Sequence, residues 1–294
     1  MNKTFGRLLT AMVTPFTSES KVNFQAAAEL ATHLVNNGSD GLVVAGTTGE
    51  SPTLTKEEKF ELFKTIKEAV GSEIPVIAGT GSYSTEESII QSQMAEKAGV
   101  DGLLLVVPYY NKPTQEGMYQ HFEAIARNTS LPIMLYNIPS RTGKNMTPET
   151  VVRLSEINNI IAIKESTGDF SQLTELKSGL KNDFLIYSGD DALLLPMMAL
   201  GAYGVVSVVS HLVGKQIKEM IDAFIDGDHN KALELHLKLS PLFKTMFITT
   251  NPIPIKTALA LQGHQVGGFR LPLCKASDEE VSIIKNMLHK YDLL

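Results

Sequence analysis

The chain has 294 residues, of which 43% are hydrophobic and 20% are charged, and its formal net charge is −6. This length is compatible with one large domain or two smaller ones, each with a sizeable core. The acidic balance argues against a nucleic-acid partner, because a basic footprint is missing. No polybasic segment is present to hold a membrane surface.

Two further features bear on the compartment. Cys274 is the only cysteine, so no intrachain disulfide can form, and we expect a reducing compartment and a buried thiol. The segment Ala192–Gly214 has no acidic or basic residue except His211 and is long enough to span a bilayer. A proline and two glycines interrupt it, so we interpret it as a helix, a glycine cap and a buried strand. These features predict a soluble, cytoplasmic protein.

Eight short apolar runs recur along the chain at roughly regular distances. They are nearly continuous in valine, isoleucine and leucine, which is typical of strands buried on both faces of a parallel sheet. The runs begin at Leu8, Gly41, Ile74, Gly102, Pro132, Ile160, Phe184 and Tyr203. Helical patterns lie between them, such as residues 55–70, where Thr55 and Glu58 have the spacing of a capping box.

Alternating strands and helices predict right-handed βαβ crossovers. Eight such units favour an α/β fold of the closed (β/α)8 TIM-barrel type. The alternative is a doubly wound open sheet, which is disfavoured because no Gly-x-Gly-x-x-Gly turn follows the first strand. The remaining sequence has helical patterns only. We therefore expect a barrel with the catalytic site over residues 1–213 and a C-terminal helical domain over residues 214–294 that packs on it.

In a (β/α)8 barrel, polar groups at the carboxyl ends of the strands face one shared site. The second run ends in GTTGES (residues 46–51), whose glycines and hydroxyls suit a small anion such as a carboxylate. Most such turns are merely tight turns. The fourth run ends near Tyr109 and Tyr110, which could equally pack on a hydrophobic edge. The fifth ends at Tyr136 and is followed by Arg141, which is either a solvated loop cation or a bidentate partner for a carboxylate.

The sixth run ends in Lys164, although a lysine at a strand end is more often solvated than catalytic. Isoleucines surround it, and it lies where the barrel mouth is expected. A Schiff-base lysine must be neutral, whereas an ordinary lysine with a pKa of about 10.4 is almost wholly protonated at pH 7. Desolvation can lower such a pKa by several units. Tyr136 lies one βα unit earlier, on the adjacent strand, so the two side chains can meet over one reacting atom. The hydroxyls of Thr48, Tyr136 and Tyr110 could then shuttle protons.

Other chemistries find little support in the sequence. None of the seven histidines follows a strand end in a ligand-like pair, and His211 is the nearest exception. The stretch SGDD could bind a metal, but a helix N-cap by Asp190 or Asp191 is favoured. Neither a nucleophile elbow nor a P-loop is present. We therefore expect no metal and no cofactor.

The motifs GTTGES, PYYNKP, YNIPSRTG, IAIKES and YSGDD, in this order and spacing, resemble the dihydrodipicolinate synthase family. These are pyruvate-dependent class I aldolases, and N-acetylneuraminate lyase is a relative. The resemblance covers essentially the whole chain, including NPIPIK at residues 251–256. It implies a lyase that condenses pyruvate with L-aspartate 4-semialdehyde to 4-hydroxy-tetrahydrodipicolinate, in the biosynthesis of diaminopimelate and lysine.

The resemblance also implies catalytic roles. Lys164 forms an imine with pyruvate, and Tyr136, Thr48 and Tyr110 match the proton-relay triad of the family. In the family, the tyrosine that corresponds to Tyr110 enters from a neighbouring subunit. The resemblance therefore implies a homodimer or a homotetramer built as a dimer of dimers.

Substrate-binding residues follow from the same resemblance. Thr47 and Thr48 correspond to the residues that hold the pyruvate carboxylate, and Arg141 to the residue that receives the carboxylate of the semialdehyde. Gly189 and Val206 correspond to positions that line the site through backbone atoms. Val206 stands where isoleucine is frequent.

One departure from the family concerns inhibition by lysine. Family members that bind lysine have histidines in the helix after GTTGES and an asparagine after the third strand, whereas this chain has Lys56, Lys59 and Tyr83. Glu87 and Tyr109 are kept. Two cations at a site for a cationic ligand should repel it, so we expect weak or absent inhibition by lysine.

Two alternatives to the synthase remain. One is a sibling lyase for N-acetylneuraminate or keto-deoxy sugar acids, which shares the lysine, the tyrosine and the glycine-rich turn. Paired threonines and Arg141 favour the synthase, because a second carboxylate requires a guanidinium. The other is a non-catalytic pyruvate-binding barrel, against which the intact set of Lys164, Tyr136, Thr48 and Tyr110 argues.

Overall fold

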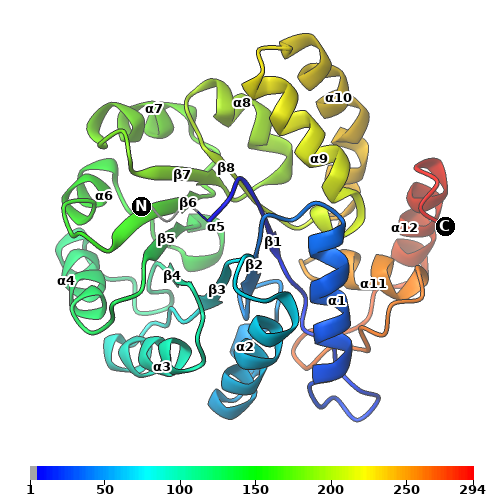
Figure 1. Cartoon of the computed structure of the whole chain (residues 1–294), viewed down its shortest axis with the longest axis horizontal. Coiled ribbons are helices and arrows are strands. Elements are labelled where there is room, and N and C mark those ends of the chain that lie inside the picture. Colours follow the sequence, from blue (N-terminus) through cyan, green and yellow to red (C-terminus); the bar gives the residue numbers. More distant parts are fainter. Residues whose placement is uncertain (1–4) are drawn as a thin grey trace.

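The computed structural model describes residues 5–294 and shows eight parallel strands closed into a barrel in the order β1 to β8 (Figure 1). The strands are β1 (Leu8–Ala11), β2 (Gly41–Val44), β3 (Val76–Gly79), β4 (Gly102–Val106), β5 (Ile133–Asn137), β6 (Ile160–Glu165), β7 (Leu185–Ser188) and β8 (Gly204–Ser207). Strand β8 pairs with β1, where Val206 aligns with Leu9. The predicted (β/α)8 barrel is confirmed, with all eight strands in the predicted places.

A ring of helices surrounds the barrel (Figure 1). They are α1 (Phe24–Asn36), α2 (Lys56–Val70), α3 (Thr85–Lys97), α4 (Gln115–Ala126), α6 (Pro148–Leu154), α7 (Phe170–Gly179), α8 (Leu194–Ala199) and α9 (Ser210–Ile225). Three short elements follow strands β2, β5 and β7, namely η1 (Ser51–Thr53), α5 (Pro139–Thr142) and η2 (Asp191–Leu193). Helix α2 begins with the predicted capping box, in which the side chains of Thr55 and Glu58 each accept a backbone N–H of the other.

The C-terminal helices are α10 (His229–Thr245), α11 (Ile253–Leu261) and α12 (Asp278–Lys290). They lie on the side of the barrel where α1 and α9 are found (Figure 1). The expected boundary between residues 213 and 214 falls inside α9, beside Val213, whose φ of −132° and ψ of 39° are not helical. Helix α9 contacts β1 and α1 as well as α10. The division into two domains stays a prediction.

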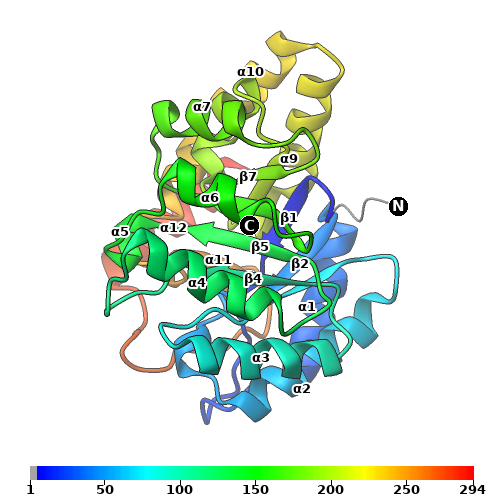
Figure 2. The ribbon, with the colours of Figure 1, turned by 90° about the vertical axis from the view of Figure 1, so that its left-hand side faces the viewer.

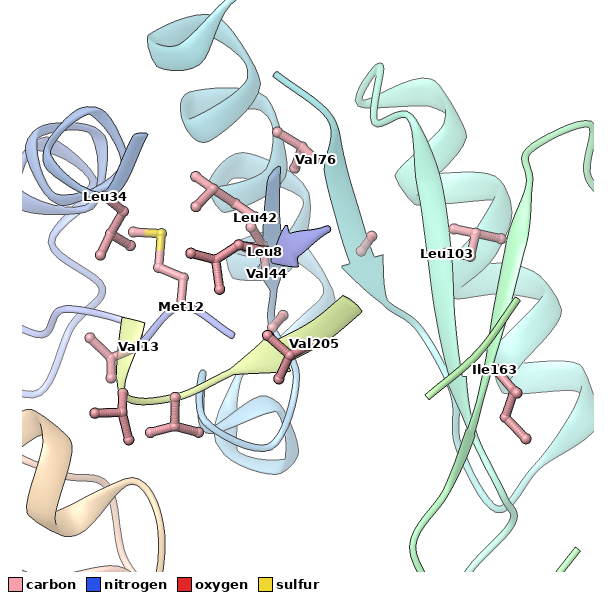
Figure 3. Close-up of a cluster of buried hydrophobic side chains, with 14 of the residues drawn as sticks. Leu8, Met12, Val13, Leu34, Leu42, Val44, Val76, Leu103, Ile163 and Val205 are labelled. Atoms are coloured by element: carbon pink, nitrogen blue, oxygen red, sulfur yellow. The ribbon is translucent and has the colours of Figure 1, made fainter. Parts of the chain in front are cut away.

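Strand alternation divides the core into two layers. Side chains facing outward, such as Leu8, Leu42 and Val76, pack with helix residues such as Leu34 of α1 (Figure 3). Side chains facing inward fill the barrel and include Ala162 of β6 and Tyr136 of β5. Since Lys164 follows Ala162 by two residues on β6, its side chain also enters the barrel. Figure 2 shows β5 pointing toward α5, which marks the carboxyl end of the barrel.

Two expectations about hydrophobic segments have different outcomes. The segment Ala192–Gly214 contains α8, Gly201 with a φ of 92°, and buried β8, as predicted. Over residues 5–294 no helix has the length and apolar character needed to cross a membrane. The expectation of a buried Cys274 is wrong, because this residue is exposed. It lies in the irregular chain between α11 and α12, where no helix or strand covers it.

Candidate active site

Lys164 stands at the carboxyl end of β6, and only 7% of its surface is exposed. The register of β5 and β6 aligns it with Tyr136, as expected from their separation in sequence. Its Nζ lies 4.2 Å from the centroid of the Tyr136 ring. None of the ion pairs among residues 5–294 includes Lys164. The amine is therefore buried against the face of an aromatic ring and forms no ion pair with a described carboxylate.

Gly189, after β7, leaves the space that the lysine occupies. A Cβ atom at this position would lie 2.9 Å from Cε of Lys164 and 1.8 Å from Oγ of Ser166. Any side chain would therefore displace both groups. Ser166 was missed by the sequence reasoning, and its buried hydroxyl has no hydrogen-bond partner among the described residues. Its position in the sequence could have indicated it, because a residue two positions after Lys164 lies on the same side of an extended chain.

The turn after β2 holds Thr47, which is half-buried, and Thr48, which is 3% exposed. The backbone is left-handed at Ala45 and at Glu50, with φ of 52° and 55°. Such conformations are costly for residues other than glycine and persist where the surroundings fix them. Oγ1 of Thr48 accepts a hydrogen bond of 2.9 Å from Nδ2 of Asn251, which belongs to the C-terminal helical region.

Glu50 anchors the same turn through a buried ion pair. Its Oε1 lies 2.8 Å from Nζ of Lys256 on α11, and the two side chains are 1% and 0% exposed. Its other carboxylate oxygen accepts the backbone N–H of Arg270. Burial lowers the pKa of Lys256 to about 8, and the Glu50 carboxylate opposes this shift. The sequence offered one indication of these contacts, because in NPIPIK (residues 251–256) a lysine interrupts a strongly apolar helix.

Two predicted site residues are exposed within the single chain. Tyr110, in the loop after β4, is 89% exposed and has a φ of 68°. Arg141, on the short helix α5 after β5, is exposed. The structure of a single chain therefore brings Lys164, Tyr136 and Gly189 together and leaves the side chains of Tyr110 and Arg141 in solvent. Val206, on β8, is buried in the interior layer.

The acidic pair after β7 has structural roles. The side chain of Asp190 accepts the N–H of Ala192 and caps η2, as predicted. Asp191 is buried and accepts hydrogen bonds from the Ser207 hydroxyl and from the N–H groups of Val208 and Val209. Burial raises the pKa of Asp191 to about 6, and these donors oppose the shift. Both carboxylates are therefore committed to the loops that begin η2 and α9.

A closed (β/α)8 barrel that buries a lysine at its mouth defines the class of this protein, a lyase of the class I aldolase type. The model of the dihydrodipicolinate synthetase family matches residues 4–291. The chain belongs to this family.

Individual relatives agree with this assignment. The chain is 58% identical to a 4-hydroxy-tetrahydrodipicolinate synthase of Desulforamulus reducens, over 99% of this chain and 98% of that protein. It is 55% identical to the synthase of Desulforudis audaxviator over the whole of both chains. The crystal structure of dihydrodipicolinate synthase from Cyanidioschyzon merolae with lysine bound superposes with a TM-score of 0.97, at 48% identity over 99% of each chain. The crystal structure of a chloride-inhibited dihydrodipicolinate synthase from Acinetobacter baumannii complexed with pyruvate superposes with a TM-score of 0.95, at 38% identity over 99% of this chain and 100% of that one.

Proposed function

We propose that the protein condenses pyruvate with L-aspartate 4-semialdehyde to form 4-hydroxy-tetrahydrodipicolinate, in the route to diaminopimelate and lysine. The observation that carries this proposal is the buried amine of Lys164 beside Tyr136, at the mouth of a barrel with Thr47 and Thr48 on the same rim. Relatives with that enzymatic name share up to 58% of their residues with this chain over nearly its full length.

The reaction begins when Nζ of Lys164 attacks the keto carbon of pyruvate. Water leaves after proton transfers, which the hydroxyls of Tyr136 and Thr48 conduct. The resulting imine is an electron sink, so the methyl carbon loses a proton and an enamine forms. The enamine carbon attacks the aldehyde of the second substrate. The amine of that substrate then attacks the imine carbon, closes the ring and releases Lys164.

Two groups bind carboxylates in this scheme. The hydroxyls of Thr47 and Thr48 receive the carboxylate of pyruvate, so that its keto carbon faces the lysine. The exposed guanidinium of Arg141 has no carboxylate partner among the described residues and is available for the carboxylate of the semialdehyde. A fork of two parallel N–H donors fits a carboxylate better than the single ammonium of a lysine would.

The exposure of Tyr110 supports an oligomer. A tyrosine that is 89% exposed and held in a left-handed backbone conformation contributes little to its own chain. We infer that its hydroxyl completes the relay of a neighbouring subunit, in a homodimer or a homotetramer built as a dimer of dimers. The variant Tyr110→Phe should then lose activity without losing thermal stability.

Two substrates distinguish the proposed reaction from that of a sibling lyase. The purified protein should turn over pyruvate with L-aspartate 4-semialdehyde at least about 100-fold faster, in kcat/KM, than it cleaves N-acetylneuraminate, because the sugar acid has only the carboxylate of its pyruvate portion and no second carboxylate for Arg141. Preferred cleavage of the sugar acid would replace the proposal with the sibling activity. Turnover of neither would favour a non-catalytic pyruvate-binding barrel.

The residues at the expected lysine-binding position favour weak inhibition. Nζ of Lys56 lies 2.9 Å from Glu87 and holds the pKa of that carboxyl below its usual range. Lys59 is 7% exposed, and its Nζ donates to Gln91 over 2.9 Å. Burial lowers the pKa of Lys59 to about 8. The ammonium group of Lys56 thus occupies the Glu87 carboxylate, and that of Lys59 adds a second positive charge beside it.

Titration of the activity with L-lysine checks this expectation. The native protein should keep most of its activity at millimolar lysine, and the double variant Lys56→His and Lys59→His should become more sensitive, because it removes two fixed positive charges at neutral pH. Half-inhibition of the native protein below 1 millimolar would contradict the expectation.

A further inference from the structure

The side chain of Asn251 connects the C-terminal helical region to the proposed relay. Asn251 is 6% exposed, lies two residues before the start of α11, and is separated from Thr48 by 203 positions in the sequence. Its Nδ2 donates to Oγ1 of Thr48 over 2.9 Å. A hydroxyl that accepts on one lone pair keeps its own proton for another partner. The contact therefore directs the Thr48 proton away from Asn251.

A second contact holds this arrangement in place. Lys256 lies on the first turns of α11, and its buried ion pair with Glu50 fixes the turn two residues beyond Thr48. The ammonium of Lys256 also lies 4.1 Å from the centroid of the Phe16 ring. The left-handed conformation of Glu50 makes this turn depend on such external support. Asn251 therefore contacts the residue before Gly49, and Lys256 contacts the residue after it.

We propose that Asn251 is a positioning residue for the reaction, which orients the Thr48 hydroxyl so that its proton points toward the Schiff-base adduct on Lys164. The proposal rests on the proposed function. It makes the C-terminal helical region part of the catalytic apparatus, since the amide that sets the direction of the relay comes from outside the barrel. The other amide atom, Oδ1, is buried and has no partner among the described residues, so the contact with Thr48 is the hydrogen bond that fixes this side chain.

The variant Asn251→Asp tests the direction of the hydrogen bond. Aspartate has nearly the same shape, but as a carboxylate it accepts and does not donate. It would draw the Thr48 proton toward itself and away from the adduct. We expect kcat to fall about 100-fold and the KM for pyruvate to rise as well, because the Thr48 hydroxyl serves both proton transfer and the pyruvate carboxylate. Activity should partly return as the pH is lowered and the aspartate is protonated.

A double-mutant cycle tests whether Asn251 acts through Thr48. The variants are Asn251→Ala, Thr48→Val and the combination of both. If the amide acts only by orienting the hydroxyl, the double variant should be no slower than Thr48→Val alone. Asn251→Ala also provides the measurement if the aspartate variant does not fold, and thermal unfolding of each variant identifies the folded ones.

The control is Asn159→Ala. Asn159 directly precedes β6, at the opposite end of the strand from Lys164, and its Nδ2 donates to three backbone carbonyls in the stretch from the last residue of α4 to β5. This control should lower stability and leave kcat within about twofold of the native value. An Asn251→Asp variant with native kcat and a native pH profile would overturn the proposal, as would independent, multiplicative effects of Asn251→Ala and Thr48→Val. If the native protein forms no pyruvate adduct, the proposed function is wrong. If the adduct forms but the Asn251 variants behave like the native protein, only the role of Asn251 is wrong.

Discussion

The two ends of the barrel use charge in opposite ways. At the amino end, Asp40 accepts the backbone N–H groups of Arg7 and Leu8 and pairs with Lys218 of α9. Asp101 likewise accepts the N–H of Val76 and pairs with Lys67. These carboxylates satisfy the first backbone donors of the strands, so charge at this end stabilises the fold.

At the carboxyl end, several polar groups of the proposed chemistry have no partner within the chain. Lys164 has no carboxylate beside it among the described residues, the hydroxyl of Ser166 is buried without a partner, and Tyr110 extends into solvent. In (β/α)8 barrels the amino end serves stability and the carboxyl end serves catalysis. Other groups at this end are paired. Asp191 accepts hydrogen bonds from Ser207, Val208 and Val209, and the ion pair Lys256–Glu50 supports the turn that holds Thr48.

Removal of the Lys164 amine should have the largest effect on activity. In Lys164→Met the proposed nucleophile is lost, so kcat/KM should fall by about four orders of magnitude. Because the amine is buried without a carboxylate partner, its removal should leave the unfolding temperature unchanged or raise it. Steady-state kinetics and calorimetry measure the two quantities. A variant that loses stability and activity together would break the distinction between the two ends.

Substitution of Lys256 should have the largest effect on stability. The variant Lys256→Met leaves Glu50 buried and unpaired, which should cost about 3–5 kcal/mol of unfolding free energy. The matched control is Lys218→Met at the amino end, where the side chains of the Lys218–Asp40 pair are 39% and 24% exposed. That loss should be below about 1 kcal/mol, because water screens the pair. Urea unfolding of both variants measures the difference, and equal losses would contradict it.

The variant Tyr136→Phe removes one hydroxyl and keeps the ring that covers Lys164. We expect kcat to fall about 100-fold, because a general acid–base group contributes about 10²–10⁴ in rate. The pyruvate adduct should still form, only more slowly. Pre-steady-state kinetics of adduct formation separate this outcome from a loss of binding. If kcat and the rate of adduct formation are both unchanged, Tyr136 is not part of the proposed proton relay.

The smallest effect concerns acid stability. His211 is buried after β8, where its Nε2 accepts the N–H of Val13 and its Nδ1 donates to the carbonyl of Val208. Burial lowers the pKa of His211 from 6.5 to about 4. The unfolded chain therefore binds a proton that the folded chain does not, and stability falls as the pH drops from about 6.5 to 4.

This histidine should account for about 2–3 kcal/mol of that loss. Unfolding curves recorded across this range should be flatter for His211→Gln, and substitution of the exposed His289 provides the control. An identical pH dependence in native protein and His211→Gln would contradict the assignment.

The sequence allowed the barrel and its central pair to be predicted for a physical reason. Strands buried on both faces leave nearly continuous apolar runs, and one βα unit between Tyr136 and Lys164 places them on neighbouring strands. The contacts of Thr48 with Asn251 and of Glu50 with Lys256 could not be derived this way. They join residues more than 200 positions apart, through a turn whose left-handed backbone no local pattern indicates.

The same limit explains the error at Cys274. A cysteine is usually buried, but its exposure depends on whether a helix covers the irregular segment around it, and in this chain none does. The role proposed for Tyr110 likewise depends on atoms of a second chain. Local periodicity therefore predicts elements and registers, whereas long-range side-chain contacts required the structure.

Trapping of the pyruvate adduct tests the central claim most directly. The native protein is incubated with pyruvate, reduced with borohydride and digested, and the modified residue is identified by mass spectrometry. A secondary amine forms irreversibly when the imine is reduced, so one adduct should appear, on Lys164, and Lys164→Met should give none. The absence of an adduct on the native protein, or an adduct on another residue, would contradict the account.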